Sequence, residues 1–127
     1  MPKVILNIED SLLLALRRKA VDTKQSMSDF VNNRITKIKE VCRKYNVLSV
    51  HLFGSVLTKE FNERSDIDLL VDFRRDSFHG AFDQFMNFKS DMEDFFQRRV
   101  DLISRSTIRN QILKSEIYSS RVQIYAA

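Results

Sequence analysis

The chain has 127 residues and a net charge of +4, and its 43% hydrophobic content suffices for one ordinary domain or two very small ones. This composition argues against collagen-like, linker-like and disordered classes, and one proline with two glycines indicates long helices and few elaborate loops. No apolar run could span a membrane, and Glu9 and Asp10 interrupt any signal-peptide core. Because Cys42 is the single cysteine, we expect a reduced, cytoplasmic protein with no disulfide.

The charge is distributed unevenly along the chain. Residues 1–46 carry ten basic and five acidic side chains, whereas residues 47–127 carry eleven basic and twelve acidic ones. A basic first third beside a near-neutral remainder suggests that the two parts meet different partners. The alternative is a solvated helix surface that is rich in lysine and arginine.

The first third predicts a strand followed by two helices. Alternating apolar residues indicate a strand over residues 3–8, and Asp10 or Ser11 is expected to cap the first helix. Ser26 or Ser28 is expected to cap the second. No glycine or proline follows before residue 45, so this second helix is predicted to run unbroken into the rest of the chain. Three such elements cannot bury a core alone, so the segment must dimerise or pack on the remainder.

Residues 2–35 resemble the ribbon-helix-helix family of small dimeric DNA-binding proteins. The resemblance rests on the short strand and on the two helix starts, and it implies a homodimer whose paired strands enter the major groove of operator DNA. The implied DNA contacts are Lys3, Ile5 and Asn7 at base edges, with Ser26 and Ser28 at phosphates. There are two alternatives to DNA binding: this segment serves only for dimerisation, or its strand adds to a neighbouring sheet.

The chemistry-bearing pattern follows in residues 47–73. A buried strand is predicted over residues 47–53, ending at Gly54 and Ser55, and a second over residues 66–73. Strand periodicity places Asp66 and Asp68 on the same face of the second strand. Two carboxylates so close repel each other and cost desolvation unless a cation lies between them, and oxygen ligands of this kind suit Mg²⁺.

A third carboxylate lies in the predicted strand over residues 100–103. Asp101 has apolar neighbours on both sides, and it joins the first two carboxylates if its strand pairs beside the second one. A phenylalanine-rich stretch from residue 77 to residue 99 predicts a core helix, with a late start at Gly80. A closing helix over residues 107–119 and a short strand-like end complete the chain.

The Gly54-Ser55 pair, the Asp66-x-Asp68 spacing and the later Asp101 resemble the polymerase-β-like nucleotidyltransferases, and most closely their minimal members. The resemblance covers residues 36–127. It implies an α/β fold, a small mixed sheet flanked by helices, here preceded by the strand-helix-helix arm of residues 1–35. It also implies that Asp66, Asp68 and Asp101 are catalytic and hold two Mg²⁺ ions, and that Gly54 and Ser55 bind the triphosphate of ATP.

One departure from the family pattern concerns the residues after the serine. Many members have an arginine and a glycine there, whereas Val56-Leu57-Thr58-Lys59 follows here, so Lys59 or Arg64 is the candidate cation for the triphosphate. The resemblance implies transfer of AMP to a partner protein, a helical HEPN-type toxin, by an antitoxin. The alternative is a catalytically inactive antitoxin that binds DNA and neutralises its partner by contact alone.

Overall fold

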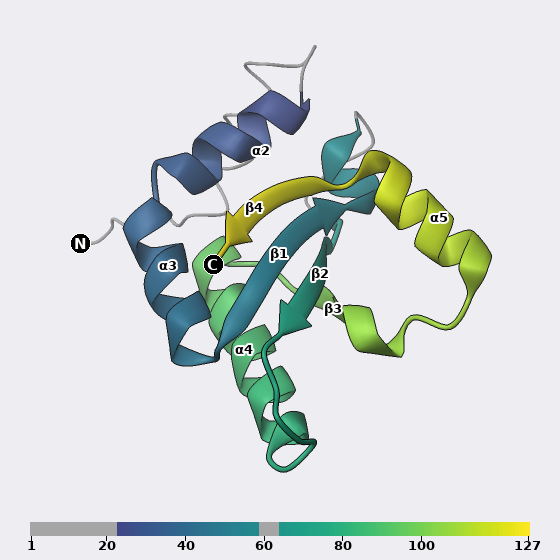
Figure 1. Cartoon of the computed structure of the whole chain (residues 1–127). Coiled ribbons are helices and arrows are strands. Elements are labelled where there is room, and N and C mark those ends of the chain that lie inside the picture. Colours follow the sequence, from purple (N-terminus) through teal and green to yellow (C-terminus); the bar gives the residue numbers. More distant parts are fainter. Residues whose placement is uncertain (1–22, 59–63) are drawn as a thin grey trace.

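The computed structural model describes residues 23–58 and 64–127, and its centre is a four-stranded sheet (Figure 1). The strands lie in the order β3-β2-β1-β4, with β1 antiparallel to β2 and β4, and β2 parallel to β3. The strands are β1 (Val47–Phe53), β2 (Ile67–Phe73), β3 (Val100–Ser104) and β4 (Val122–Ala126). The helices are α2 (Thr23–Asn32), α3 (Ile35–Lys44), α4 (Ala81–Phe96) and α5 (Gln111–Ser120), with short 3-10 turns η1 (Gly54–Leu57) and η2 (Arg105–Thr107).

Three helices cover one face of the sheet and form the main core. Along β2, Ile67, Leu69 and Val71 alternate toward this core and are fully buried. The buried residues of α4 recur at helical spacing and meet them: Phe88, Met92, Phe95 and Phe96. Parallel strands need a crossover, which α4 supplies between β2 and β3.

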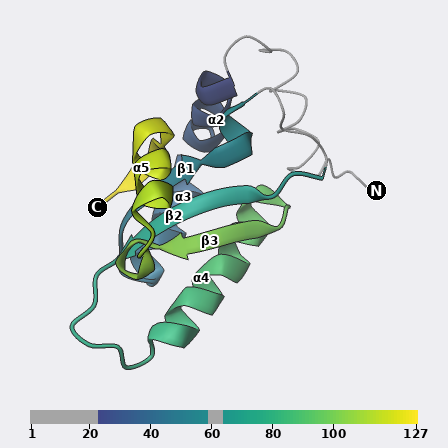
Figure 2. The ribbon, with the colours of Figure 1, turned by 90° about the vertical axis from the view of Figure 1, so that its right-hand side faces the viewer.

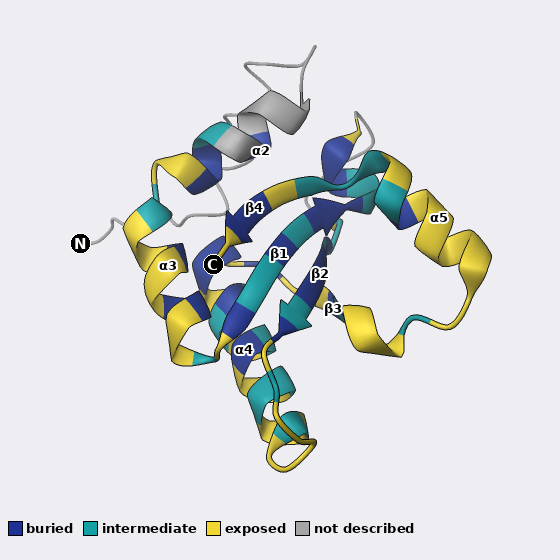
Figure 3. Ribbon diagram, in the orientation of Figure 1, coloured by how far each residue is buried: buried dark blue, intermediate teal, exposed yellow. Residues whose placement is uncertain are grey.

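The opposite face of the sheet is only partly covered, by α5 (Figure 2). Ile117 is the one buried residue of α5, and it packs against Phe53 and Leu70 in a separate small cluster. The side chain of Asn110 caps this helix by accepting hydrogen bonds from the backbone N–H groups of the second and third residues that follow it. Most of α5 is exposed (Figure 3), and sheet residues on this face such as His51 and Asp72 are only half-buried.

The predicted strands over residues 47–53, 66–73 and 100–103 are confirmed to within one residue at each end. The late start of the core helix is confirmed as well, since Gly80 precedes α4 in a left-handed conformation with φ of 74°. The described part of the chain contains no helix that is long and apolar enough to cross a bilayer.

The prediction of one unbroken second helix is wrong. Backbone bonds from Asn33 to Asp29 and from Arg34 to Val31 close a tight turn that separates α2 from α3. Ser26 and Ser28 lie inside α2, which begins at Thr23, so neither serine is its cap.

The break between the helices has a tertiary cause. It lets α2 fold back onto the core, where Phe30 lies 6.1 Å and 6.0 Å, centroid to centroid, from the rings of Phe95 and Phe96. Burial of Phe30, together with Met27 and Val31, outweighs the few backbone bonds that a continuous helix would add. Of the two options left open for the first third, packing on the remainder therefore holds for α2. The predicted strand and first helix, with Lys3, Ile5 and Asn7, lie outside the described residues.

Candidate active site

Two of the predicted carboxylates are neighbours across adjacent strands. In the parallel register of β2 and β3, Asp68 stands opposite Asp101, and both alternate away from the main core. Residues opposite each other on adjacent strands of a sheet are about 5 Å apart, so these two side chains share one patch of the open face. The pairing on which the predicted three-carboxylate site depended is thus present.

The Asp68 carboxyl is electrostatically strained in this position. Burial, followed by the nearby charges of Asp101 and Asp66, raises its pKa to about 6. A carboxylate in this state is costly to ionise without a counter-charge. The site is therefore built to gain from a cation placed between Asp68 and its acidic neighbours.

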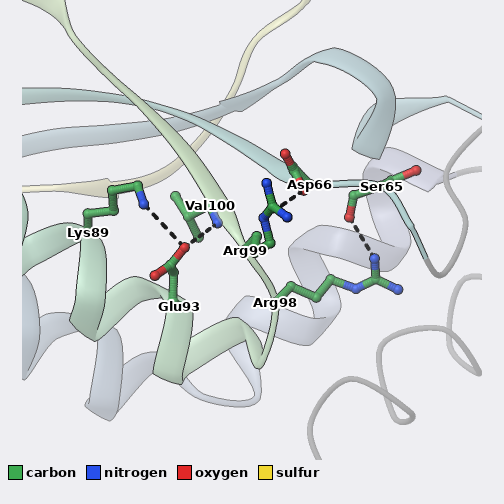
Figure 4. A network of polar contacts seen from close by, with 7 residues as sticks. All are labelled: Ser65, Asp66, Lys89, Glu93, Arg98, Arg99 and Val100. Carbon is green, nitrogen blue, oxygen red and sulfur yellow. Dashed lines mark hydrogen bonds and ion pairs between the residues drawn. The ribbon is translucent and has the colours of Figure 1, made fainter.

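Asp66 lies immediately before β2, at the edge of the site (Figure 4). Its Oδ1 is 3.9 Å from Nε of Arg99, which precedes β3. The backbone N–H of Ile67 donates to the carbonyl of Arg99 at 3.0 Å and continues the parallel pairing to this point. Asp66 is thus within electrostatic range of Asp68 but is half exposed and turned toward an arginine.

A polar network that the sequence analysis did not identify fixes the starts of β2 and β3. The side chain of Glu93 in α4 accepts a hydrogen bond of 2.9 Å from the backbone N–H of Val100. Nη1 of Arg98 donates to the carbonyl of Ser65 at 2.7 Å (Figure 4). Val100 and Ser65 come one residue before Asp101 and Asp66, so the two bonds tie the end of α4 and the residues after it to the segments that carry the carboxylates. They act as positioning contacts for the site.

Gly54 directly follows β1 and lies against Asp68. It has φ of 80°, and a Cβ built on it would overlap Oδ2 of Asp68 and stand 3.1 Å from its Cγ. Glycine is therefore required here both by backbone conformation and by the close approach of a site carboxylate. The half-buried Ser55 follows in η1, and its carbonyl accepts hydrogen bonds of 2.9 Å from both the backbone N–H and Oγ1 of Thr58.

The donor set fits a magnesium ion that shares its shell with a substrate. Within residues 23–58 and 64–127, no three His, Cys, Asp or Glu side chains converge closely enough to enclose a metal by themselves. Mg²⁺ is commonly held by one or two carboxylates plus substrate phosphates, and Asp68 with Asp101 provides such a pair. Of the two candidate phosphate cations, Arg64 is exposed just before the site, and Lys59 lies outside the described residues.

Comparison with known proteins identifies the family. Residues 36–127 match the family described as Polymerase beta, Nucleotidyltransferase. The chain belongs to this family. A relative from Methanocaldococcus jannaschii, provisionally named protein adenylyltransferase MJ1379, is 31% identical over 98 residues, which span 71% of this chain and 97% of the relative. Protein adenylyltransferase MntA of Thermococcus cleftensis is 31% identical over 61% of this chain and 75% of its own length.

Solved structures agree on the fold. A protein provisionally named a minimal nucleotidyltransferase matches with a TM-score of 0.60 and 24% identity over 75% of this chain and 93% of that chain. A toxin–antitoxin crystal structure with AMP-PNP matches with a TM-score of 0.56 and 18% identity over 72% of this chain and 73% of that one. The predicted nucleotidyltransferase class and the α/β fold with a mixed sheet are thereby confirmed.

Proposed function

We propose that this nucleotidyltransferase is the antitoxin of a two-protein module and that it transfers AMP from ATP to a helical HEPN-type toxin with the help of Mg²⁺. The observation that carries the proposal is the pairing of Asp68 with Asp101 beside Gly54. The names of the matched relatives support it, because they are protein adenylyltransferases and a toxin–antitoxin complex with AMP-PNP.

In the proposed reaction, a hydroxyl oxygen of the acceptor attacks the α-phosphorus of ATP. A phosphorus–oxygen bond to the acceptor forms, the bond between the α- and β-phosphates breaks, and pyrophosphate leaves. Asp101, which is exposed on the edge strand β3, is the proposed acceptor of the proton of the attacking hydroxyl. Asp66 and Asp68 are the proposed ligands of two Mg²⁺ ions, and Asp101 is proposed to complete the shell of one of them. The ions would neutralise the charge that develops on the phosphates. Gly54, Ser55 and either Lys59 or Arg64 are the proposed contacts of the triphosphate.

Label transfer tests the proposal. The purified chain is incubated with Mg²⁺, ATP labelled at the α-phosphate, and the protein encoded by the neighbouring gene. We expect label on the partner, lost in Asp68→Asn and Asp101→Asn and retained in Asp76→Asn, whose exposed carboxyl lies beyond the far end of β2. An absence of transfer from all four nucleotides, with the partner still bound, would falsify the enzymatic proposal.

A second function, DNA binding by a homodimer through residues 1–35, is favoured by the excess of basic side chains in the first 46 residues. Phosphate contacts require that affinity for the upstream DNA of the gene falls steeply with salt. A variant with Lys3→Ala and Asn7→Ala should bind this DNA more weakly than the unmodified chain. Equal binding by the two would count against the ribbon-helix-helix proposal.

A further inference from the structure

A cavity of about 240 Å³ lies between the end of β1 and α5. Its lining comprises Phe53, Gly54, Leu113, Glu116, Ile117 and Ser120. The four residues from α5 are spaced by three, four and seven positions, so they belong to a single face of the helix. Such a volume lies below the ~300–1,000 Å³ of sites for drug-sized ligands and suits one ring system.

This cavity adjoins the carboxylate site directly. Phe53 is the antiparallel partner of Asp68, and the next residue, Gly54, lies against the Asp68 carboxylate. A molecule that fills the cavity is therefore separated from the carboxylates by a single residue of backbone. A nucleotide whose phosphates lie at Gly54 and Asp68 can extend its other end into this space.

We propose that the cavity holds the nucleobase and that Glu116 selects bases with an exocyclic amino group. The proposal rests on the proposed nucleotidyl transfer and adds the part of the nucleotide that the carboxylates do not contact. Phe53, Leu113 and Ile117 provide apolar contacts for the faces of a planar ring. They leave recognition of the ring edge to the polar residues of the lining.

Glu116 is the polar group that discriminates among bases. Oγ of Ser120 donates to the backbone carbonyl of Glu116 at 3.1 Å, so this hydroxyl is engaged within its own helix. An ionised carboxylate only accepts hydrogen bonds, so it favours a base whose edge carries an amino group and disfavours one with a keto oxygen at that position. Adenine satisfies this rule, and uracil does not.

The helix that carries Glu116 is held in place by contacts on both sides. Ile117, the next residue, is 2% exposed and packs on the sheet. Nε of Arg105 donates to the hydroxyl of Tyr118 at 3.0 Å, and its Nη1 lies 3.2 Å from Oδ2 of Asp72 in β2. The helix backbone that carries Glu116 is therefore already ordered, so binding of a base costs little backbone freedom at this wall.

Equilibrium binding in the presence of Mg²⁺ tests this assignment. The ligands are ATP, the triphosphate of purine riboside, which is ATP without its amino group, and inorganic tripolyphosphate. Because Glu116 is an exposed residue, we expect Glu116→Ala to bind ATP about 3- to 10-fold more weakly, the range for an ordinary hydrogen bond. Its affinity for the purine analogue and for tripolyphosphate should not change. Ser115→Ala, which alters an exposed residue of the same helix outside the cavity, should bind all three as the unmodified chain does.

The outcomes separate the two proposals. If Glu116→Ala weakens the binding of ATP and of the purine analogue equally, or weakens neither, the proposed role of Glu116 is overturned while nucleotidyl transfer is left intact. With UTP added as a fourth ligand, a chain that binds tripolyphosphate but prefers UTP to ATP would also overturn it. Failure of the unmodified chain to bind any nucleotide or tripolyphosphate with Mg²⁺ would remove the proposed function and this inference together.

Discussion

Replacing Gly54 with alanine should destabilise the protein in two ways: through the backbone conformation and through a steric overlap with Asp68. Both glycines of the chain have left-handed φ values, 80° at Gly54 and 74° at Gly80. An alanine in this conformation costs about 1–2 kcal/mol at either site. At Gly80 the new methyl group meets nothing within 4 Å, whereas at Gly54 it overlaps Asp68. Overpacking of this kind adds about 1–3 kcal/mol, so Gly54→Ala should cost about 2–5 kcal/mol in total.

Chemical denaturation with thermal melts measures the difference. At about 4 °C per kcal/mol for a domain of this size, Gly54→Ala should melt roughly 4–12 °C below Gly80→Ala. The excess should shrink in an Asp68→Ala background, because the remaining Cβ of residue 68 is 3.4 Å from the built methyl position, an ordinary contact. Equal destabilisation by the two glycine substitutions, or an excess that persists without the Asp68 carboxylate, would refute the steric argument.

Three further predictions concern the core, the site and α5. Without metal, burial and the charges of Asp101 and Asp66 raise the pKa of Asp68 to about 6, so the native state should lose stability as pH rises from about 4 to 6. In thermal melts above pH 6, Asp68→Asn should therefore be more stable than the unmodified chain, and equal stabilities there would contradict this. In urea unfolding, Phe88→Ala should lower the free energy of unfolding by about 3–5 kcal/mol, whereas Phe82→Ala, at a site 75% exposed, should change it by no more than about 0.5 kcal/mol. Similar losses for the two variants would contradict the burial pattern. Arg105→Gln removes the guanidinium that joins Asp72 to α5. Hydrogen exchange of the backbone amides in residues 111–120 should therefore accelerate, while the free energy of unfolding falls by no more than about 1 kcal/mol. Unchanged exchange would show that this contact does not hold the helix.

The strands and the carboxylate pair were predictable because their signals are local. The apolar run of the first strand ends at Gly54. Periodicity predicted Asp66 and Asp68 on one face of a strand over residues 66–73, whereas β2 begins at Ile67 and Asp66 lies just before it. The sequence predicted that Asp101 lies near Asp68 only if the two strands pair side by side. Whether they pair, and in which register, depends on the crossover that joins them. Their chemical roles stay predictions for the label-transfer experiment.

The break after α2 and the network at Glu93 were not predictable in this way. Neither glycine nor proline marks the turn at Asn33, and Phe30 continues the apolar spacing of a longer helix. The turn forms because Phe30 gains contacts with rings some 65 residues away in the sequence. Glu93 likewise bonds a backbone group across the end of α4, and nothing in the periodicity of a helix marks that contact.

The packing of α2 extends the core of this chain beyond the region that matches the family. The family match begins at residue 36, one residue into α3, yet Met27, Phe30 and Val31 before it are almost fully buried among residues that follow it. A fragment cut at that boundary would expose the rings of Phe95 and Phe96 at the end of α4, the helix whose Glu93 anchors β3. The segment that distinguishes this chain from the matched family region thus also supports the strand on which Asp101 lies.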